Sequence, residues 1–346
     1  MEIRALNASF EPIGMTKIKY FDLMWNRKYY ESGSFSVQIM ACDYLPDMSY
    51  IYTSERPELG MVQSIEYSDD GNMVVLSGFF YEKKLADKIV YPVYNGIGTP
   101  EEIAREIVYT YKSDIPKILL GESTGTGTSV TKQETGGNLD EVVSNLLVTE
   151  EKAYRCRYDY IADTVYFDVW KGVDRTQSQS DNNFVTFSKG FRNLTKVKTK
   201  DDCSNFKNYA VVAGSGQSDE RIYQIVDLSD GGYKQQIFVD CRNEKYNPSN
   251  QTLSEYKAAL YQKGIEKLQS YVDIHNIEFD ALANSGFVYL EDYDLGDKCD
   301  IIVEDVQRSY EARIIEICET WNKGIHTVTL TFGDKIPTKY EKARIK

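Results

Sequence analysis

Carboxylates gather in one short segment of the chain, residues 291–297 (EDYDLGD). Carboxylate oxygens are ligands that Ca²⁺ prefers, and an EF-hand loop needs a glutamate at its twelfth position. A loop that began at Asp292 would have Val303 there. The segment therefore predicts a tight turn with Gly296 at positive φ, which glycine adopts without steric cost, and no metal site.

A second segment with the composition of a ligand-binding loop is glycine-rich, residues 121–129 (GESTGTGTS). A phosphate-binding loop ends in Gly-Lys-Ser/Thr and follows a long apolar strand, and this segment has neither feature. We therefore expect a flexible loop that binds no nucleotide.

Histidine is rare: the chain has His275 and His326. His326 alternates with Val328 and Leu330 on one face of a predicted strand, which favours a core histidine, whereas His275 follows a helical stretch and is expected in solvent. Two unpaired histidines disfavour Ser/His or Cys/His catalysis. With 53 acidic residues some carboxylate pair is always available to a glycosidase, but no motif singles one out.

These patterns predict no catalytic residue, no cofactor-binding residue, no metal-binding residue and no cofactor, so we do not expect an enzyme. The formal net charge of −13 argues against coating DNA or anionic lipid, since both need a basic face. Six scattered cysteines predict reduced thiols in a protein made in a cytoplasm. No apolar run is long enough for membrane insertion. The 27 tyrosines suit protein interfaces and strands equally well.

Period-2 and period-3.6 patterns divide the chain into blocks. Residues 1–92 predict strands, with Phe35, Val37 and Ile39 alternating and a hairpin around 68–72. The next block predicts two helices, one with a capping box at Thr99 and one capped by Asn138, followed by a hairpin over 154–169. Strand patterns return over 184–242, a long helix is predicted within 247–284, and 286–333 are strands again.

This order predicts an α+β fold that is mainly β, with two β-barrels, an α/β domain between them and a helical insert in the second barrel. The predicted boundaries are 1–92 for the first barrel and 93–182 for the α/β domain. The second barrel is discontinuous, 183–242 and 286–336, around a helical insert at 243–285. Residues 337–346 form a C-terminal tail.

Several segments in this order resemble the bacteriophage tail hub family, which includes the Gp37-like tail proteins of siphophages and proteins similar to the Tal N-terminal region. The matching segments are residues 25–35 (WNRKYYESGSF), 171–176 (KGVDRT), 184–214 (FVTFSKGFRNLTKVKTKDDCSNFKNYAVVAG), 293–301 and 327–333. Cys299 stands where an aliphatic residue is expected. The resemblance implies that both barrels are tube-like.

The resemblance further implies a structural virion protein, a homotrimeric hub at the tail tip or baseplate of a phage or prophage. Such a hub adapts a hexameric tail tube to a three-fold tip. Its expected partners are further copies of itself, the distal tail and tail tube proteins, the tape-measure protein, and downstream tip, fibre or receptor-binding proteins, with DNA only in transit. Because the chain stops at Lys346, just past the last predicted strand, we expect the hub alone.

Two alternatives stay open from the residues themselves. One is an enzyme that acts on peptidoglycan or another carbohydrate through an unrecognised carboxylate pair. The other is a monomeric carbohydrate-binding β module, which would need exposed aromatic side chains on a concave face.

Overall fold

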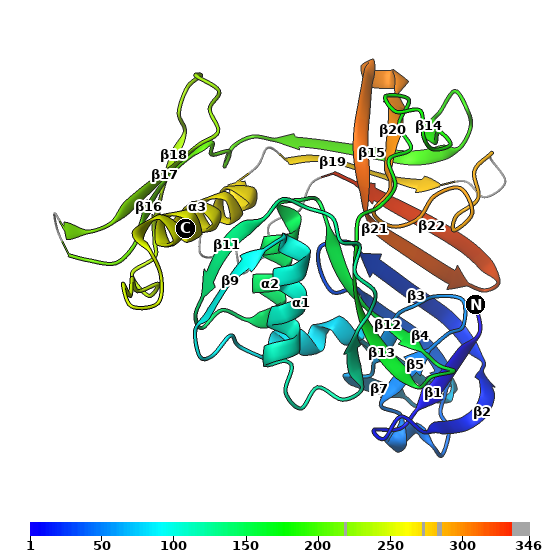
Figure 1. The fold of residues 1–346 in the computed structure, drawn as a ribbon. Helices are drawn as coiled ribbons and strands as arrows, with labels where there is room; N and C mark the ends of the chain where they lie inside the picture. The colour runs from blue at the N-terminus through cyan, green and yellow to red at the C-terminus, as the bar shows by residue number, and fades with distance from the viewer. Residues whose placement is uncertain (218–219, 272–273, 282–285, 334–346) are drawn as a thin grey trace.

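Strands dominate the chain, and strands from its N-terminal and C-terminal parts pair in one sheet (Figure 1). The computed structural model describes residues 1–217, 220–271, 274–281 and 286–333. The predicted α+β, mainly β class is confirmed. The predicted tail at 337–346 lies outside the described residues.

The largest sheet has ten strands, eight of them in one continuous antiparallel order. From edge to edge the order is β15 (Leu194–Asp202), β19 (Ile274–Ala281), β22 (Ile325–Phe332), β21 (Arg308–Asn322), β3 (Tyr20–Lys28), β4 (Ser34–Met40), β8 (Met73–Phe79) and β7 (Ser64–Ser68). The first half of β21 also pairs with β20 (Lys298–Val303), which pairs with β14 (Thr186–Ser188). The two halves of the chain meet at β3 and β21, where Trp25 stands opposite Glu319.

The N-terminal β unit comprises the strands up to β8. A four-stranded sheet covers β3, β4 and β8 and is made of β2 (Pro12–Ile18), β1 (Ile3–Leu6), β5 (Tyr50–Tyr52) and β6 (Leu59–Met61). The alternating residues Phe35, Val37 and Ile39 are buried between the layers, as predicted. The rings of Trp25 and Phe80 lie 4.7 Å apart in this core. The predicted hairpin is confirmed as β7 and β8.

The C-terminal β unit comprises β14, β15 and β19–β22, and its core is aromatic. Phe187 on β14 is buried among the rings of four other residues, Phe279, Phe287, Tyr293 and Phe332. Aromatic pairs in such edge-to-face and offset contacts add to the hydrophobic gain from burial.

The α/β unit lies between the two β units in sequence. It contains β9 (Tyr94–Gly98), α1 (Pro100–Tyr111), β10 (Ile118–Leu120), β11 (Val130–Glu134), α2 (Leu139–Val148), β12 (Ala153–Asp159) and β13 (Thr164–Trp170). The Thr99 capping box and the β12–β13 hairpin are confirmed. Helix α2 begins after Asn138 as predicted, but the Asn138 side chain makes no capping hydrogen bond, so that part of the prediction is wrong.

A separate three-stranded sheet carries one helix on one face, at the left of Figure 1. We call it the helix-covered sheet: β17 (Tyr223–Asp227), β16 (Tyr209–Ala213), β18 (Gln236–Asp240) and α3 (Leu253–Leu268). Tyr256, Leu260 and Leu268 of α3 are buried against it. Short 3₁₀ turns occur at η1 (Leu45–Asp47), η2 (Asp70–Asn72), η3 (Tyr81–Asp87), η5 (Gln269–Tyr271) and η6 (Glu304–Val306).

The helix predicted within 247–284 is too long. Helix α3 ends at Leu268, and β19 occupies Ile274–Ala281. Within β19 the buried Ile277 and Phe279 follow period 2, and pairing with β15 and β22 satisfies the strand's backbone hydrogen bonds. The predicted domain boundaries remain a prediction.

Buried ion pairs connect helix α3 of the helix-covered sheet to strand β11 of the α/β unit. The Lys132 ammonium on β11 lies 2.5 Å from a carboxylate oxygen of Glu266 on α3 and 3.1 Å from one of Glu134, and all three side chains are almost fully buried. Lys263 on α3 also bonds Glu134. Because every charge here faces an opposite one, the interface tolerates ionic groups that would be costly alone.

The cysteines are free thiols, as predicted. Within the described residues, no helix combines the length and apolar character needed to cross a bilayer.

Candidate functional site

The acidic turn at 291–297 uses its carboxylates to hold the chain together. Asp294 accepts a hydrogen bond from Arg27 at 2.6 Å. Asp297 accepts from the Val173 amide at 2.8 Å and from Arg175 Nε at 2.7 Å. Gly296 has φ of +92°, so the predicted tight turn is confirmed. Across the described part of the chain, no group of three His, Cys, Asp or Glu residues is placed to hold a metal ion.

Replacing Gly296 by alanine is expected to lower the free energy of unfolding by about 2–4 kcal/mol. A Cβ atom there would sit 2.4 Å from the Tyr29 ring, in addition to the strain of positive φ. Gly231→Ala is the matched control, because Gly231 has φ of +81° with open space around it, so only the backbone strain of about 1–2 kcal/mol is expected. Urea unfolding of both variants measures the difference, and equal losses would contradict the crowding at Tyr29.

The glycine-rich loop at 121–129 wraps around a buried carboxylate. The Thr124 amide and the Ser123 hydroxyl donate to Glu101 Oε1 at 2.6 and 2.9 Å. Burial raises the pKa of Glu101, but these hydrogen bonds outweigh burial and leave it lowered. Polar groups of this loop that could cradle a phosphate are therefore occupied by the protein's own carboxylate.

The same loop contains a Gly-x-Ser-x-Gly pattern at residues 121–125. A nucleophile elbow needs a strand before the serine, a helix directly after it and a histidine within reach. Here β10 precedes Ser123, but strand β11 follows the loop, and the Ser123 hydroxyl donates to Glu101. The pattern is therefore a chance match within a structural loop.

The junction of β3 and β21 holds a charge cluster that we call the junction network. Arg27 is 2% exposed and donates to Glu58 at 2.6 Å, to Asp294 at 2.6 Å and to the Tyr289 hydroxyl at 2.8 Å. Burial lowers the pKa of Arg27, but Glu58, Tyr289 and Asp294 outweigh burial and raise it well above its ordinary value. The guanidinium is thus permanently charged and ties together three segments far apart in sequence.

A second ion pair extends the junction network toward the surface. Arg56 donates to both carboxylate oxygens of Glu319, at 2.7 and 2.6 Å, which is the strong bidentate arrangement. His326 lies 3.1 Å from Glu319 and stacks on Trp321. Burial raises the pKa of Glu319, but His326 and Arg56 outweigh it and leave the pKa lowered. A carboxylate held in this way is a poor general base.

The prediction of a core position for His326 is wrong, because its side chain is 39% exposed. His326 shares a face of β22 with Val328, but it is the second residue of the strand, where the side chains are exposed. The side chain of His275 lies outside the described parts of the structure.

Glu82 is the carboxyl whose pKa burial raises most clearly. Burial and the nearby Glu58 raise the pKa to about 8, against backbone hydrogen bonds that lower it. Its Oε2 is buried without a hydrogen-bond partner. Glu82 lines neither of the two cavities below, so the raised pKa marks a buried structural group and not an accessible acid.

Replacing Glu82 by glutamine is expected to remove much of the pH dependence of stability. Between pH 4.5 and about 8 the folded chain keeps a proton that the unfolded chain has released. The free energy of unfolding therefore falls as pH rises, by up to about 1.4 kcal/mol per pH unit. Urea unfolding at pH 5 and pH 9 should show Glu82→Gln more stable than the wild type at pH 9. The exposed control Glu66→Gln should keep the wild-type slope; an unchanged slope in Glu82→Gln would contradict the assignment.

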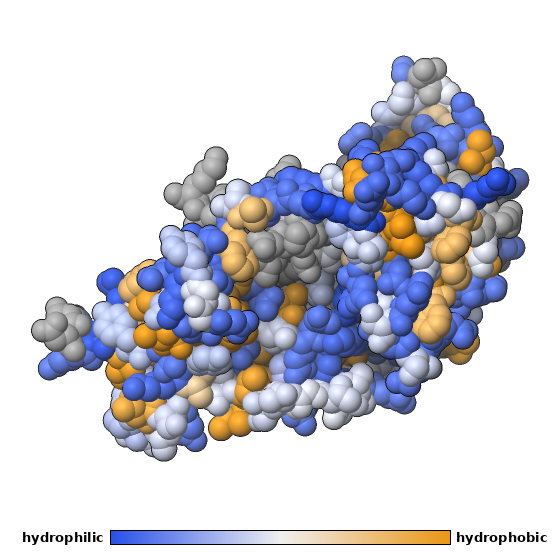
Figure 2. Space-filling view, turned by 90° about the horizontal axis from the view of Figure 1, so that it is seen from above, coloured by the Kyte–Doolittle hydropathy of each residue, from blue (hydrophilic) through white to orange (hydrophobic). Residues whose placement is uncertain are grey.

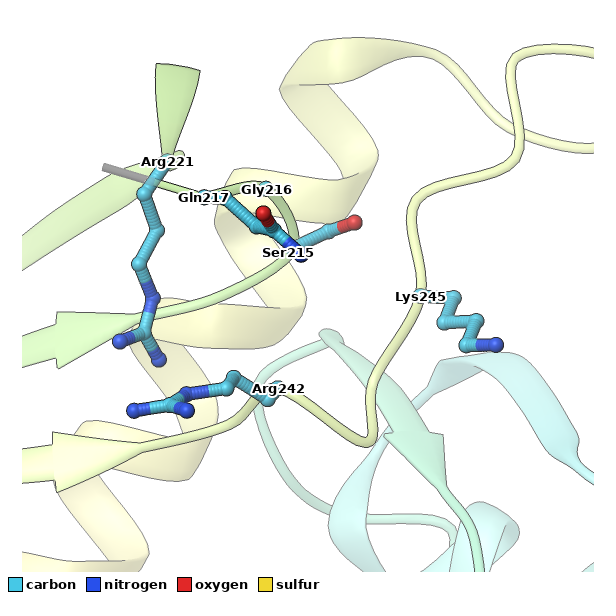
Figure 3. A pocket seen from close by; sticks show the side chains of 6 residues that line it. All are labelled: Ser215, Gly216, Gln217, Arg221, Arg242 and Lys245. Atoms are coloured by element: carbon cyan, nitrogen blue, oxygen red, sulfur yellow. The ribbon is translucent and has the colours of Figure 1, made fainter. Parts of the chain in front are cut away.

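A cavity of about 570 Å³ opens at one end of the helix-covered sheet (Figure 3). Its lining is polar and consists of Ser215, Gly216, Gln217, Arg221, Arg242 and Lys245. The last three of these side chains are cationic. The guanidinium groups of Arg221 and Arg242 lie beside each other in Figure 3, whereas the Lys245 side chain points away from them. We call this cavity the cationic pocket.

A second cavity, of about 490 Å³, lies between α3 and the β9–β11 pair. Its lining mixes apolar and uncharged polar groups with Lys257. The lining of each cavity, as far as the structure describes it, contains no histidine, aspartate or glutamate.

Comparison with known families gives a match over nearly the whole chain. The family model described as Siphovirus ReqiPepy6 Gp37-like protein matches residues 2–334. The chain belongs to this family. The resemblance inferred from the sequence segments is thereby confirmed, and a search of curated proteins finds no match.

Solved structures of tail proteins share the fold of this Gp37-like chain from end to end. Prophage tail protein gp18 from Listeria monocytogenes EGD-e has a TM-score of 0.59 at 13% identity, covering 100% of this chain and 99% of that one. The tail protein from Neisseria meningitidis MC58 has a TM-score of 0.59 at 10% identity, covering 96% of both chains. The 43 kDa tail protein of prophage MuSo2 from Shewanella oneidensis has a TM-score of 0.57 at 13% identity, covering 97% and 99%.

Sequence patterns missed the cationic pocket and the junction network of this Gp37-like protein. Arg221 and Arg242 come from different loops, and Arg27 and Asp294 are brought together by strand pairing. No local periodicity marks such residues, because their proximity depends on long-range contacts.

Proposed function

We propose that this protein is a structural component of a phage tail, a homotrimeric hub at the tail tip or baseplate. The observation that carries the proposal is the end-to-end correspondence of the fold with a prophage tail protein, over 100% of this chain and 99% of the other. Membership of the Gp37-like family supports the same class of function.

The strand order supports two comparable β units in each chain. Outward from the junction, β3, β4, β8 and β7 form one antiparallel run, and β21, β22, β19 and β15 form another. Each run has a core of its own. In the proposal each unit is a tube-like domain: the first lies within the predicted range 1–92, and the second is made of β14, β15 and β19–β22. Three chains would then present six units to a hexameric tube.

The proposed partners are those of a channel-forming adaptor. Further copies of the chain close the ring, in which one patch repeatedly contacts a different patch. The tail tube and distal tail proteins dock on one side, downstream tip or fibre proteins on the other, and the tape-measure protein and DNA pass through. A net charge of −13 suits transit, because a polyanion is repelled and not retained.

The experiment that tests this function is light scattering of the purified full chain over a range of concentrations. A particle of three times the chain mass of 39.7 kDa is expected. A monomer that still fails to trimerise when mixed with tube and distal tail proteins would overturn the trimeric hub.

A further inference from the structure

One arginine of the cationic pocket is fixed in place by hydrogen bonds to the backbone. Arg221 Nε donates to the Gly214 carbonyl at 3.0 Å and Nη2 donates to the Ala213 carbonyl at 2.7 Å. Arg221 also pairs with Asp240, whose other carboxylate oxygen lies 3.1 Å from Arg242 Nε. The backbone bonds fix the guanidinium in place before any ligand arrives, so little side-chain entropy remains to be lost on binding.

Positive charge remains after these pairs are counted. Asp240 is shared between two arginines, and the Arg242 side chain is still 69% exposed. Lys245 is exposed, and its ammonium forms no ion pair with any residue that the structure describes. Such a local excess of cations in a strongly acidic chain is suited to binding an anion.

An apolar row lies on the open face of the helix-covered sheet, opposite α3. Val211 in the central strand stands beside Ile225 on β17 and Phe238 on β18. Ile225 is 49% and Phe238 57% exposed, although both are large hydrophobic side chains. At this end of the molecule, on the left of Figure 2, hydrophobic residues lie among hydrophilic ones.

The apolar row and the cationic pocket are neighbours. The Arg221 guanidinium lies over the Phe238 ring, 5.7 Å from its centre. Arg221 therefore lines the pocket with one side and contacts the row with the other. We call the combined surface the docking face.

We propose that the docking face binds an acidic segment of a partner protein. Carboxylates of the segment would enter the cationic pocket, where guanidinium groups bind them bidentately, and its apolar side chains would cover the row. We choose an acidic protein segment as the occupant because its carboxylates are complementary in charge to the cationic pocket. The inference concerns a partner site and does not depend on the trimeric hub.

Nucleic acid fits the same surface less well. A backbone of phosphates is bound by a basic stripe, whereas here the cations are confined to one end of a small sheet. The overall charge of −13 repels a long polyanion, and an apolar row offers nothing to phosphate. A short protein segment can present carboxylates and apolar side chains together.

Fluorescence anisotropy of the full chain with a labelled peptide of six alternating leucine and glutamate residues tests the proposal. We expect binding that weakens with salt, and at least about tenfold weaker binding of the same peptide with glutamine in place of glutamate. Arg242→Gln and Lys245→Gln together should weaken binding about tenfold, and Phe238→Ser should weaken it severalfold. Arg192→Gln, at an exposed arginine on another unit, should leave binding unchanged.

Three results would overturn the proposal. The peptide fails to bind at millimolar concentration, or the glutamine peptide binds equally well, or a labelled single-stranded oligonucleotide binds through Arg242 and Lys245 while the peptide does not. Because Arg242 and Lys245 are exposed, their variants are expected to fold, and thermal unfolding confirms it. Light scattering of the same samples reports trimer formation separately, so failure of the hub and failure of the docking face are distinguishable.

Discussion

Replacing Phe187 by alanine is expected to lower the free energy of unfolding by about 3–5 kcal/mol. Phe187 is 1% exposed and lies at the centre of the aromatic core of the C-terminal β unit. Its ring is 5.1 Å from that of Phe279, 5.3 Å from Tyr293 and 5.7 Å from Phe332. Removing the ring forfeits its burial and leaves a cavity that neighbouring rings, fixed on separate strands, fill poorly.

Phe191→Ala is the matched control for this change. Phe191 lies four positions further along the chain and is 61% exposed, so its truncation should alter stability by about 0.5 kcal/mol or less. Urea unfolding followed by circular dichroism measures both variants. Similar losses in the two variants would contradict the central position of Phe187 in the core.

Replacing Arg27 by methionine is expected to cost about 3–5 kcal/mol of unfolding free energy, because it leaves buried carboxylate charge without its partner. Glu58 is 5% exposed and accepts from Arg27 and from the Trp25 indole. Methionine keeps much of the apolar stem of arginine, so the loss reports the charge and its hydrogen bonds more than packing.

A double-mutant cycle makes the Arg27 prediction specific. Adding Glu58→Gln to Arg27→Met should recover part of the loss, because the unpaired charge is then removed. The exposed control Lys19→Met should stay within about 0.5 kcal/mol of the wild type. Strict additivity of the two changes in chemical denaturation would show that Arg27 and Glu58 do not stabilise each other.

Local patterns predicted the elements whose stabilising contacts are close in sequence. The Thr99 capping box, the β7–β8 and β12–β13 hairpins and the Gly296 turn each depend on residues a few positions apart. The end of α3 was mispredicted, because β19 is stabilised by pairing with β15 and β22, whose paired residues lie 47 to 87 positions away in the chain. Partners at such separation leave no mark in a short window of sequence.

The candidate sites divide in the same way. The acidic turn and the glycine-rich loop could be found from the sequence. The sequence also argued against an EF-hand in the turn and a phosphate-binding loop in the glycine-rich segment, because such motifs require fixed residues at fixed spacing. The cationic pocket could not, since its arginines lie at the ends of different strands and become neighbours only when β16, β17 and β18 pair.

The sequence by itself determined the mainly β class, the order of the blocks and the resemblance to phage tail proteins. Periodicity and segment order are properties of the sequence alone and need no knowledge of the fold. Only the tertiary structure decided that β3 joins β21, that Arg27 is buried against Asp294, and that His326 lies near an exposed strand end. These features depend on which strand edges meet. Backbone hydrogen bonding is the same at every edge, so long-range packing alone selects the partner.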